Sequence, residues 1–333
     1  MIMNEILCSK IIKNSVEKIL IQHDTCVFIF HGQEGIGKRS FANFLTNKIL
    51  QSKINNNYFK IDLPLKLNDL QKKNENLFLN NTHPDVFILE EENDKTIKID
   101  KVRKLKQFLT QTSSVSEYKI IIIDPIEDLT INATNTLLKS LEETNHNTYV
   151  FLISHNLENV LKTIQSRVFK FYFNPISKED FISLLSDKKE FCFSNEDLIL
   201  VNNLFNFSPG KFLQFYPKEN SLMNDYIQFI DNFANRSSSE EGASDINNFE
   251  LNLKLLFLNN FIKNILSYFI EKKFSNFTIN FEKEIIKNLN LNSVLIDKIY
   301  NEFNLFQLLL RDALVYNSNI DDLIEIFLKK INL

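Results

Sequence analysis

Residues 26–40 read CVFIFHGQEGIGKRS, and this stretch decides the fold. An apolar run at 26–30 leads into a glycine-rich loop, and Lys38 follows that loop before a helix-like run at 40–50. Three of the chain's five glycines stand in the loop: Gly32, Gly35 and Gly37. Glycines let backbone N–H groups approach phosphate oxygens, and the N-terminus of the following helix adds a favourable dipole. The stretch therefore predicts a strand, a phosphate loop and a helix in that order.

The loop departs from the complete phosphate-loop pattern at one position. The pattern is G-x-x-x-x-G-K-[ST]; its last position holds Arg39, and Ser40 comes one residue too late on the helix. The missing hydroxyl is the one that would hold Mg²⁺, whereas Lys38 can still meet β- and γ-phosphates. Binding of ATP with Mg²⁺ therefore stays open, and no cofactor is required. We expect a degenerate nucleotide site made of Gly32, Gly35, Gly37, Lys38, Arg39, Ser40 and Asp124.

Apolar runs alternate with helical patterns beyond the loop. The uninterrupted β-branched run at 119–123 is typical of a parallel strand buried on both faces. The expected strands are 83–90, 119–123, 149–154 and 169–173, and the expected helices are 99–112 and 132–143. This alternation predicts an α/β fold with a doubly wound parallel sheet, in which ligands bind at the carboxyl ends of the strands. Lys38, Asp124 and Ser154 are therefore expected in one crevice.

The residues after the run at 119–123 bear on hydrolysis. Asp124 is the carboxylate expected on the Mg²⁺ side, and active enzymes with this loop often place a glutamate next to it; here the residue is Pro125. A group that positions the attacking water contributes about 10²–10⁴ in rate. We interpret Glu127 and Asp128 as solvated turn residues rather than as substitutes for that glutamate. Together with the missing hydroxyl of the loop, this predicts a chain that does not hydrolyse ATP by itself.

Ser166 and Arg167 lie between a helix-like stretch at 157–165 and a short strand. An arginine at such a boundary is usually a surface residue or one half of an ion pair. The alternative is an arginine finger that projects into the phosphate site of a neighbouring subunit. The residues alone leave both readings of Arg167 open.

The histidines and cysteines predict no metal site. His31, beside the loop, and His155, after a strand, could face the crevice, whereas His83 is interpreted as a turn residue. The three cysteines are far apart in sequence: Cys8, Cys26 and Cys192. They form no C-x-x-C pair, so we expect no zinc.

Composition narrows the class of protein. The chain has 333 residues, of which 44% are hydrophobic and 24% charged, as is ordinary for a soluble globular protein. Its net charge of −4 argues against a protein that grips nucleic acid alone, so any DNA contact would be local or shared with other subunits. Residues 1–10 show no signal-peptide pattern, and the apolar runs fall short of the ~20 residues of a membrane span. We expect a cytoplasmic protein.

The pattern of elements predicts three domains. Residues 1–173 form the P-loop domain, 174–217 a small helical domain, and 218–333 an all-helical domain. We expect an irregular excursion with a short helix at 51–81. The small polar residues at 237–245 predict a flexible loop.

Taken together, these segments resemble the delta-prime subunit family of the bacterial DNA polymerase III clamp loader, which is an AAA+ family. The segments that carry the resemblance are residues 32–38, 82–85, 99–103, 123–129, 132–143, 151–156, 163–167 and 208–211. The chain departs from the family where Val168 replaces the cysteine of a Ser-Arg-Cys motif and where Thr144-Asn145 replaces a proline pair. It also lacks the four-cysteine zinc module of many relatives, whose place residues 51–81 occupy.

The resemblance implies an AAA+ module, a helical lid and a C-terminal helical collar. It implies a pentameric complex that opens the sliding clamp and places it on primed DNA, with motor and delta subunits as partners. In that family this subunit does not hydrolyse ATP, and the residue matching Arg167 points at the ATP site of an adjacent motor subunit. The resemblance therefore favours the arginine-finger reading of Arg167.

Two rival functions remain beside this one. An active AAA+ ATPase motor of the same or a related complex would carry Ser or Thr in place of Arg39 and an acid in place of Pro125. A stand-alone P-loop protein would have no need of a finger or of a long helical C-terminus. The residues at these positions therefore favour a non-hydrolysing assembly subunit.

Overall fold

The computed structural model describes residues 10–51, 69–90, 97, 99–142, 147–186, 191–216, 222–234, 251–276, 278–289, 292–316 and 319–331. The chain divides into two compact units. The first unit comprises Met1–Asp180 and Ser208–Gly210, and the second comprises Phe181–Phe207 and Lys211–Leu333.

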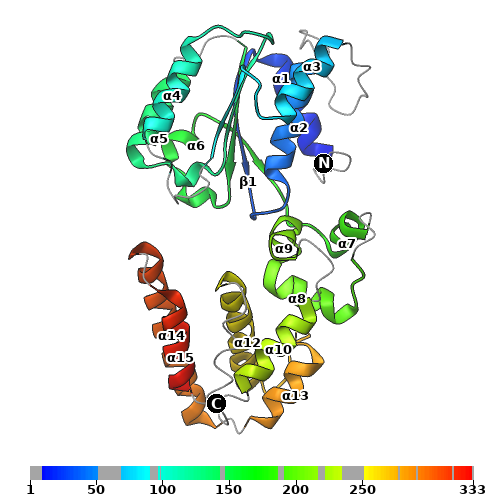
Figure 1. Cartoon of the computed structure of the whole chain (residues 1–333), viewed down its shortest axis with the longest axis vertical. Helices are drawn as coiled ribbons and strands as arrows, with labels where there is room; N and C mark the ends of the chain where they lie inside the picture. The colour runs from blue at the N-terminus through cyan, green and yellow to red at the C-terminus, as the bar shows by residue number, and fades with distance from the viewer. Residues whose placement is uncertain are drawn as a thin grey trace. The chain divides into compact units, whose positions relative to one another are not determined.

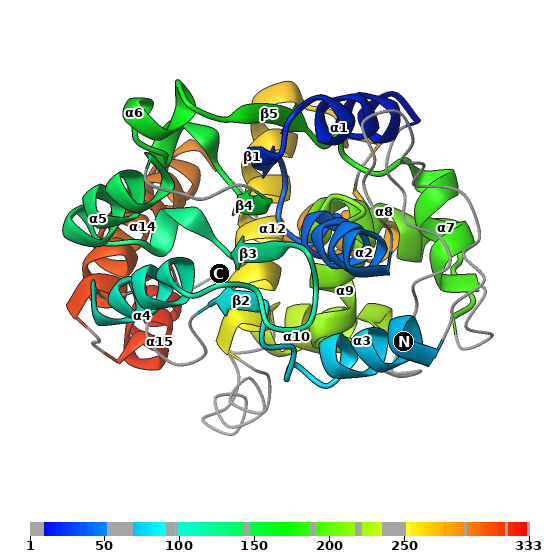
Figure 2. The same ribbon diagram turned by 90° about the horizontal axis from the view of Figure 1, so that it is seen from above.

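The first unit is built on a five-stranded parallel sheet (Figures 1 and 2). Its strands are β1 Thr25–His31, β2 Val86–Leu89, β3 Lys119–Ile123, β4 Thr148–Ser154 and β5 Phe169–Tyr172. Their spatial order is β2-β3-β4-β1-β5, so β1 lies between β4 and β5. The predicted parallel sheet is therefore confirmed, and all strands end at the same edge.

Helices cover both faces of this sheet. They are α1 Lys10–Gln22, α2 Lys38–Gln51, α3 Asp69–Leu79, α4 Ile99–Thr110, α5 Ile131–Glu142 and α6 Lys162–Gln165, with short 3₁₀ helices at Ile126–Asp128 and Leu157–Asn159. Figure 1 shows α1, α2 and α3 on one side of the sheet and α4 and α5 on the other. Every residue of β3 and β4 is buried, because each strand packs against helices on both faces. This double burial explains the continuous apolar runs of the sequence.

The side chains of β3 show how the two faces are filled. Ile120 and Ile122 belong to the core shared with α1 and α2, whereas Ile121 and Ile123 belong to the core shared with α4 and α5. Alternate residues of a strand point to opposite faces, so one strand serves both cores. A strand fixed in this way holds the residue that follows it, Asp124, at a defined place on the carboxyl edge.

Most predicted elements lie where the sequence placed them. The helix expected at 99–112 ends at Thr110, and the excursion at 51–81 contains α3, while its residues 52–68 lie outside the described residues. The loop expected at 237–245 also lies outside them.

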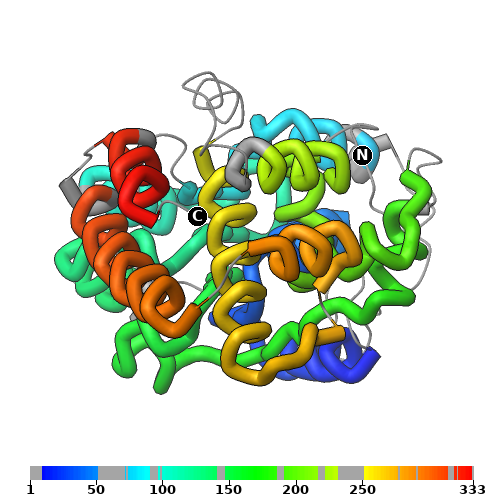
Figure 3. The backbone as a smooth tube through the Cα atoms, turned by 90° about the horizontal axis from the view of Figure 1, so that it is seen from below, coloured from blue at the N-terminus to red at the C-terminus, as the bar shows by residue number. Residues whose placement is uncertain are grey.

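The second unit is helical throughout the part of it that the structure describes. Its helices include the end of α7 Lys178–Ser186, α8 Asn195–Phe205, most of α9 Pro209–Phe215, α10 Leu222–Ala234, α12 Leu251–Glu271, α13 Asn280–Asn288, α14 Ser293–Tyr316 and α15 Ile320–Ile331. The two last helices lie side by side as a hairpin (Figure 3). Phe306 packs on Phe327 between them, with ring centroids 4.9 Å apart. Among the described residues, no helix combines the length and apolar character needed to cross a bilayer.

Candidate functional site

The glycine loop begins directly after β1, at the carboxyl edge of the sheet. All three of its glycines have positive φ: Gly32 +141°, Gly35 +78° and Gly37 +98°. At Gly32 a Cβ atom would also collide with the backbone oxygen of Phe173. Only glycine adopts such φ values without strain, so the scarce glycines stand where the backbone requires them.

Lys38 is the first residue of α2, and it turns back into the loop. Its side chain is buried, with 3% of the residue exposed. The Nζ atom donates to the carbonyl oxygen of Gly32 at 2.7 Å and to that of Gln33 at 2.5 Å. The loop is therefore wrapped around its own lysine.

A second segment of the same unit meets the loop from the other direction. Ser208 Oγ donates to the carbonyl oxygen of Glu34 at 2.8 Å, and the N–H of Gly210 donates to that of Gly35 at 2.9 Å. The two glycines touch, because a Cβ atom on Gly210 would lie 2.8 Å from the Cα of Gly35. The carbonyl groups of residues 32–35 are thus all hydrogen-bonded within the chain.

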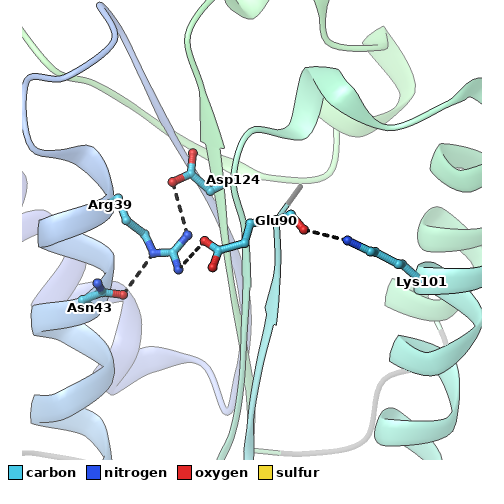
Figure 4. A network of polar contacts seen from close by, with 5 residues as sticks. All are labelled: Arg39, Asn43, Glu90, Lys101 and Asp124. Atoms are coloured by element: carbon cyan, nitrogen blue, oxygen red, sulfur yellow. Dashed lines mark hydrogen bonds and ion pairs between the residues drawn. The ribbon is translucent and has the colours of Figure 1, made fainter. Parts of the chain in front are cut away.

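Arg39 occupies the position where a complete motif has its hydroxyl. Its guanidinium contacts a different side chain through each nitrogen (Figure 4). Nη1 lies 3.2 Å from Asp124 Oδ2, Nη2 lies 3.0 Å from Glu90 Oε2, and Nε donates to Asn43 Oδ1 at 3.2 Å. The side chain of Ser40, in contrast, is exposed on α2.

The sheet explains why these two acids meet one arginine. β2 and β3 are parallel neighbours with Leu89 opposite Ile123, and the N–H of Asp124 donates to the carbonyl oxygen of Leu89 at 3.0 Å. Glu90 and Asp124 therefore leave adjacent strands at the same level. The first turn of α2 brings Arg39 to this edge, so residues distant in sequence form one cluster.

Asp124 lies in a mixed electrostatic environment. Burial raises the pKa of its carboxyl group, while the charges of Arg39, His155 and Lys38 act in the opposite direction, and the net result is a raised pKa. Burial and the nearby carboxylate of Glu127 likewise raise the pKa of Asp128. The strand ends thus bring Arg39 and Asp124 into contact, and the charge of Lys38 acts on Asp124.

The interpretation of Glu127 as a solvated turn residue was wrong. Its Oε1 atom accepts from Ser154 Oγ and from the backbone N–H groups of His155 and Asn156, each at 2.7 Å. This half-buried carboxylate holds the end of β4 in place, because it satisfies three donors at once. The expected crevice residue Ser154 is therefore bonded to Glu127.

The histidines near the loop are half-buried. The ring of His31 lies 5.3 Å from that of Tyr172, and burial together with the charges of Lys170 and Lys38 lowers its pKa. Within the described ranges, no group of three or more His, Cys, Asp or Glu residues could hold a metal ion.

Arg167 lies at the amino ends of the strands, whereas the loop lies at their carboxyl ends. It follows α6 and precedes β5, which runs from Phe169 to Tyr172. The parallel pairing puts Tyr172 beside His31, the last residue before the loop. At ~3.3 Å per residue, the strand separates its two ends by roughly 10 Å. The side chain is exposed, and its Nη1 donates to the carbonyl oxygen of Thr163 at 3.0 Å.

Sequence reasoning passed over the buried carboxylate of Asp85. It is 1% exposed and accepts the backbone N–H groups of Ser114, Val115 and Ser116 at 2.6, 2.8 and 2.7 Å. Burial raises the pKa of this group, the three hydrogen bonds lower it, and the net direction is down. The available signal in the sequence was its position, after His83-Pro84 and directly before an apolar run, where a strand begins.

A buried polar network in the second unit was also passed over. Glu282, 0% exposed, accepts from Tyr226 Oη, from Asn264 Nδ2 at 2.9 Å and from the backbone N–H of Ile279 at 3.1 Å. Asn260 Nδ2 donates to Tyr226 Oη at 2.6 Å. A glutamate in a helical pattern gives no sign in sequence that it is buried.

Comparison with known proteins supports the fold and the family. The DNA polymerase III delta subunit family matches residues 7–177, just over half of the chain. The chain is similar to DNA polymerase III subunit delta' of Pseudomonas aeruginosa, at 37% identity over 142 residues that cover 42% of this chain and 40% of that one. It is similar to the same subunit of Escherichia coli at 31% identity over 140 residues, which cover 42% and 41%. These matches span less than half of the relatives' own length.

A solved structure supports the fold over nearly the whole chain. The crystal structure of a DNA polymerase III gamma subunit-related protein from Thermotoga maritima matches with a TM-score of 0.51 and 17% identity, and covers 96% of this chain and 98% of that one. The predicted fold class, an α/β domain with a parallel sheet and flanking helices followed by an all-helical part, is confirmed. Because the family model matches just over half of the chain, the chain belongs to the DNA polymerase III delta subunit family.

Proposed function

We propose that this chain is a non-hydrolysing subunit of the replicative clamp loader, which helps to load the sliding clamp onto primed DNA. In that role it supplies Arg167 to the ATP site of a neighbouring motor subunit. Its family and the names of its relatives support membership in the DNA polymerase III complex. The motor subunit, the delta subunit, the sliding clamp and DNA are the proposed partners, and the cytoplasm is the proposed location.

The position of Arg167 carries this proposal. It precedes β5, while the chain's own phosphate loop lies beyond the carboxyl end of that strand. An arginine finger must reach the transferring phosphate, so a residue at the opposite edge cannot serve its own loop. Exposure of the side chain at the end of α6 leaves it accessible to a second subunit.

The chain's own loop supports the other half of the proposal. Pro125 follows Asp124 and has no side-chain group that could orient a water. Glu127, the nearest acid that could replace it, is committed through Oε1 to the end of β4. The loop therefore lacks both the hydroxyl for Mg²⁺ and a residue to position the attacking water.

The same proposal assigns a role to each of the two helical parts of the chain. Residues 174–217 serve as the lid and residues 218–333 as the collar through which subunits assemble. Exposed apolar side chains on α14, among them Val294, Leu305 and Leu308, fit a helix that packs against another subunit. Arg39 and Pro125 disfavour the rival function of an active motor, which would carry Ser or Thr and an acid at these two positions.

Steady-state ATPase activity of the full-length chain alone tests the non-hydrolysing role. We expect no turnover above a Lys38→Ala control, whereas the loader assembled with the same chain turns ATP over. Turnover by the isolated chain that Lys38→Ala abolishes would make this protein a motor and would overturn the proposal.

A further inference from the structure

We propose that the phosphate loop of this chain has no place for a divalent cation, because the guanidinium of Arg39 is the permanent cation of the site. P-loop ATPases hold Mg²⁺ with the hydroxyl that follows the loop lysine and with an acid at a neighbouring strand end. In this chain both positions belong to a single ion-paired cluster. The inference goes beyond the proposed function, because it concerns what the site binds rather than whether it hydrolyses ATP.

The first argument is the occupancy of the acids. Asp124 and Glu90 are the carboxylates at the two strand ends beside the loop, and each lies within 3.2 Å of a guanidinium nitrogen. Mg²⁺ requires oxygen ligands in a near-octahedral arrangement at about 2.0–2.1 Å. A metal that took Asp124 Oδ2 and Glu90 Oε2 would have to displace Arg39 from both, and one bound to their other oxygens would lie beside a like charge.

The second argument is how fully the guanidinium is held. A guanidinium offers only donors and can never act as a metal ligand. Nη1, Nη2 and Nε of Arg39 contact Asp124, Glu90 and Asn43, so each of the three guanidinium nitrogens has a partner (Figure 4). The exposed fractions of the side chains are 24% for Arg39 and 19% for Asp124, so the pair is largely shielded from water.

The third argument is the anchoring of the partners. Asp124 is held through its N–H on Leu89, and the carbonyl oxygen of Glu90 accepts from Lys101 Nζ at 3.0 Å. Asn43 lies one turn along α2 from Arg39, so its amide fixes the near side of the guanidinium. The ion pairs therefore tie α2 to the ends of β2 and β3, and a metal entering here would break that tie as well as meet a like charge.

The test is direct binding of Mn²⁺, measured by electron paramagnetic resonance of the full-length chain with Mn²⁺ alone. Wild type and Asp124→Asn should bind Mn²⁺ equally, because wild type has no Mn²⁺ site that depends on Asp124. Arg39→Ser, which removes the cation and adds a hydroxyl, should gain one such site, so that the variant binds Mn²⁺ at least tenfold more tightly than the residual, Asp124-independent binding of wild type. Adding Asp124→Asn to Arg39→Ser should abolish the gain.

Arg103 provides the matched control. It also pairs with an aspartate, Asp100, at 3.0 Å, but on the exposed surface of α4. Arg103→Ser should leave Mn²⁺ binding as in wild type. If Arg39→Ser fails to fold by circular dichroism, Arg39→Gln keeps a similar length and replaces it in the assay.

Two results would overturn the inference. One is Asp124-dependent Mn²⁺ binding by wild type, and the other is a folded Arg39 variant that gains no site. Neither outcome depends on ATP turnover, so the inference can fail while the proposed function stands.

Discussion

Two arginines of the first unit, Arg39 and Arg167, differ in what surrounds them. Arg39 lies at the carboxyl edge of the sheet, 24% exposed, with its guanidinium spread over two acids and an amide. Arg167 lies before β5 at the other edge, exposed, with Nη1 bonded to the carbonyl oxygen of Thr163 in the helix that precedes it. An arginine side chain is thus a structural cation at the carboxyl ends of the strands, in Arg39, and an accessible donor at their amino ends, in Arg167. Position in the sheet, rather than residue type, separates the two roles.

Breaking the loop should give the largest loss of stability. Gly32→Ala meets both a φ of +141° and a collision with the backbone of Phe173. We expect it to lower the free energy of unfolding by about 3–5 kcal/mol, the sum of backbone strain and overpacking. Gly37→Ala, with a φ of +98° and open space around its Cβ, is the matched control and should cost about 1–2 kcal/mol. Urea unfolding compares the two, and equal losses would show that the contact with Phe173 contributes nothing.

Removing the guanidinium of Arg39 should give the next largest loss of stability. Arg39→Met leaves the shielded carboxylate of Asp124 without its partner. We expect a loss of about 1–2 kcal/mol, less than for a fully buried pair, because the two side chains keep exposures of 24% and 19%. Arg103→Met removes an exposed pair and should change stability by less than about 0.5 kcal/mol. The same urea assay measures both. A smaller loss for Arg39→Met than for Arg103→Met would contradict the structural role of Arg39.

The two aspartates at opposite ends of the sheet should respond to pH in opposite directions. Hydrogen bonds lower the pKa of Asp85 below its ordinary 3.8, so its contribution is present above that value and is lost as the pH falls. Burial raises the pKa of Asp124 above 3.8, so stability decreases as the pH rises from that value through the raised pKa.

Unfolding free energies between about pH 3 and pH 7 test this difference. Asp85→Asn should remove part of the stability gained on going from low to neutral pH, and Asp124→Asn should increase that gain. Shifts of the same sign in the two variants would contradict the assignment of opposite pKa directions.

The smallest expected effect on stability is that of Arg167→Ala, the second arginine of the comparison. Arg167→Ala removes an exposed side chain, so the free energy of unfolding should change by less than about 0.5 kcal/mol. Thermal and urea unfolding of the isolated chain measure it. A loss near that of Arg39→Met would place Arg167 in the fold instead of on an accessible surface.

The sheet and the loop could be predicted because their signals are local. A β-branched run buried on both faces at 119–123 and three glycines after a strand identify the elements and their order. The place of Arg167 also follows from topology, because a residue before a parallel strand lies opposite the loops that follow the strands.

Asp124 was expected in the same site as Arg39, but the second acid, Glu90, could not be predicted from the sequence. Glu90 meets Arg39 only because β2 pairs with β3 in register, and nothing local in the sequence specifies that neighbour. The roles of Glu127 and Asp85 depend in the same way on backbone N–H groups from distant segments. Long-range hydrogen bonds leave no periodic pattern, so sequence reasoning placed Glu127 in solvent.

The most direct test of the account is ATP turnover by the assembled clamp loader carrying Arg167→Ala, beside loaders with wild-type chain and with Arg103→Ala. An arginine finger is worth about 10³–10⁵ in rate at the site it serves, so Arg167→Ala should silence that site, while Arg103→Ala leaves turnover unchanged. Gel filtration should show the same assembled complex for all three. Full turnover by an intact loader that carries Arg167→Ala would contradict the claim that this chain completes the active site of its neighbour.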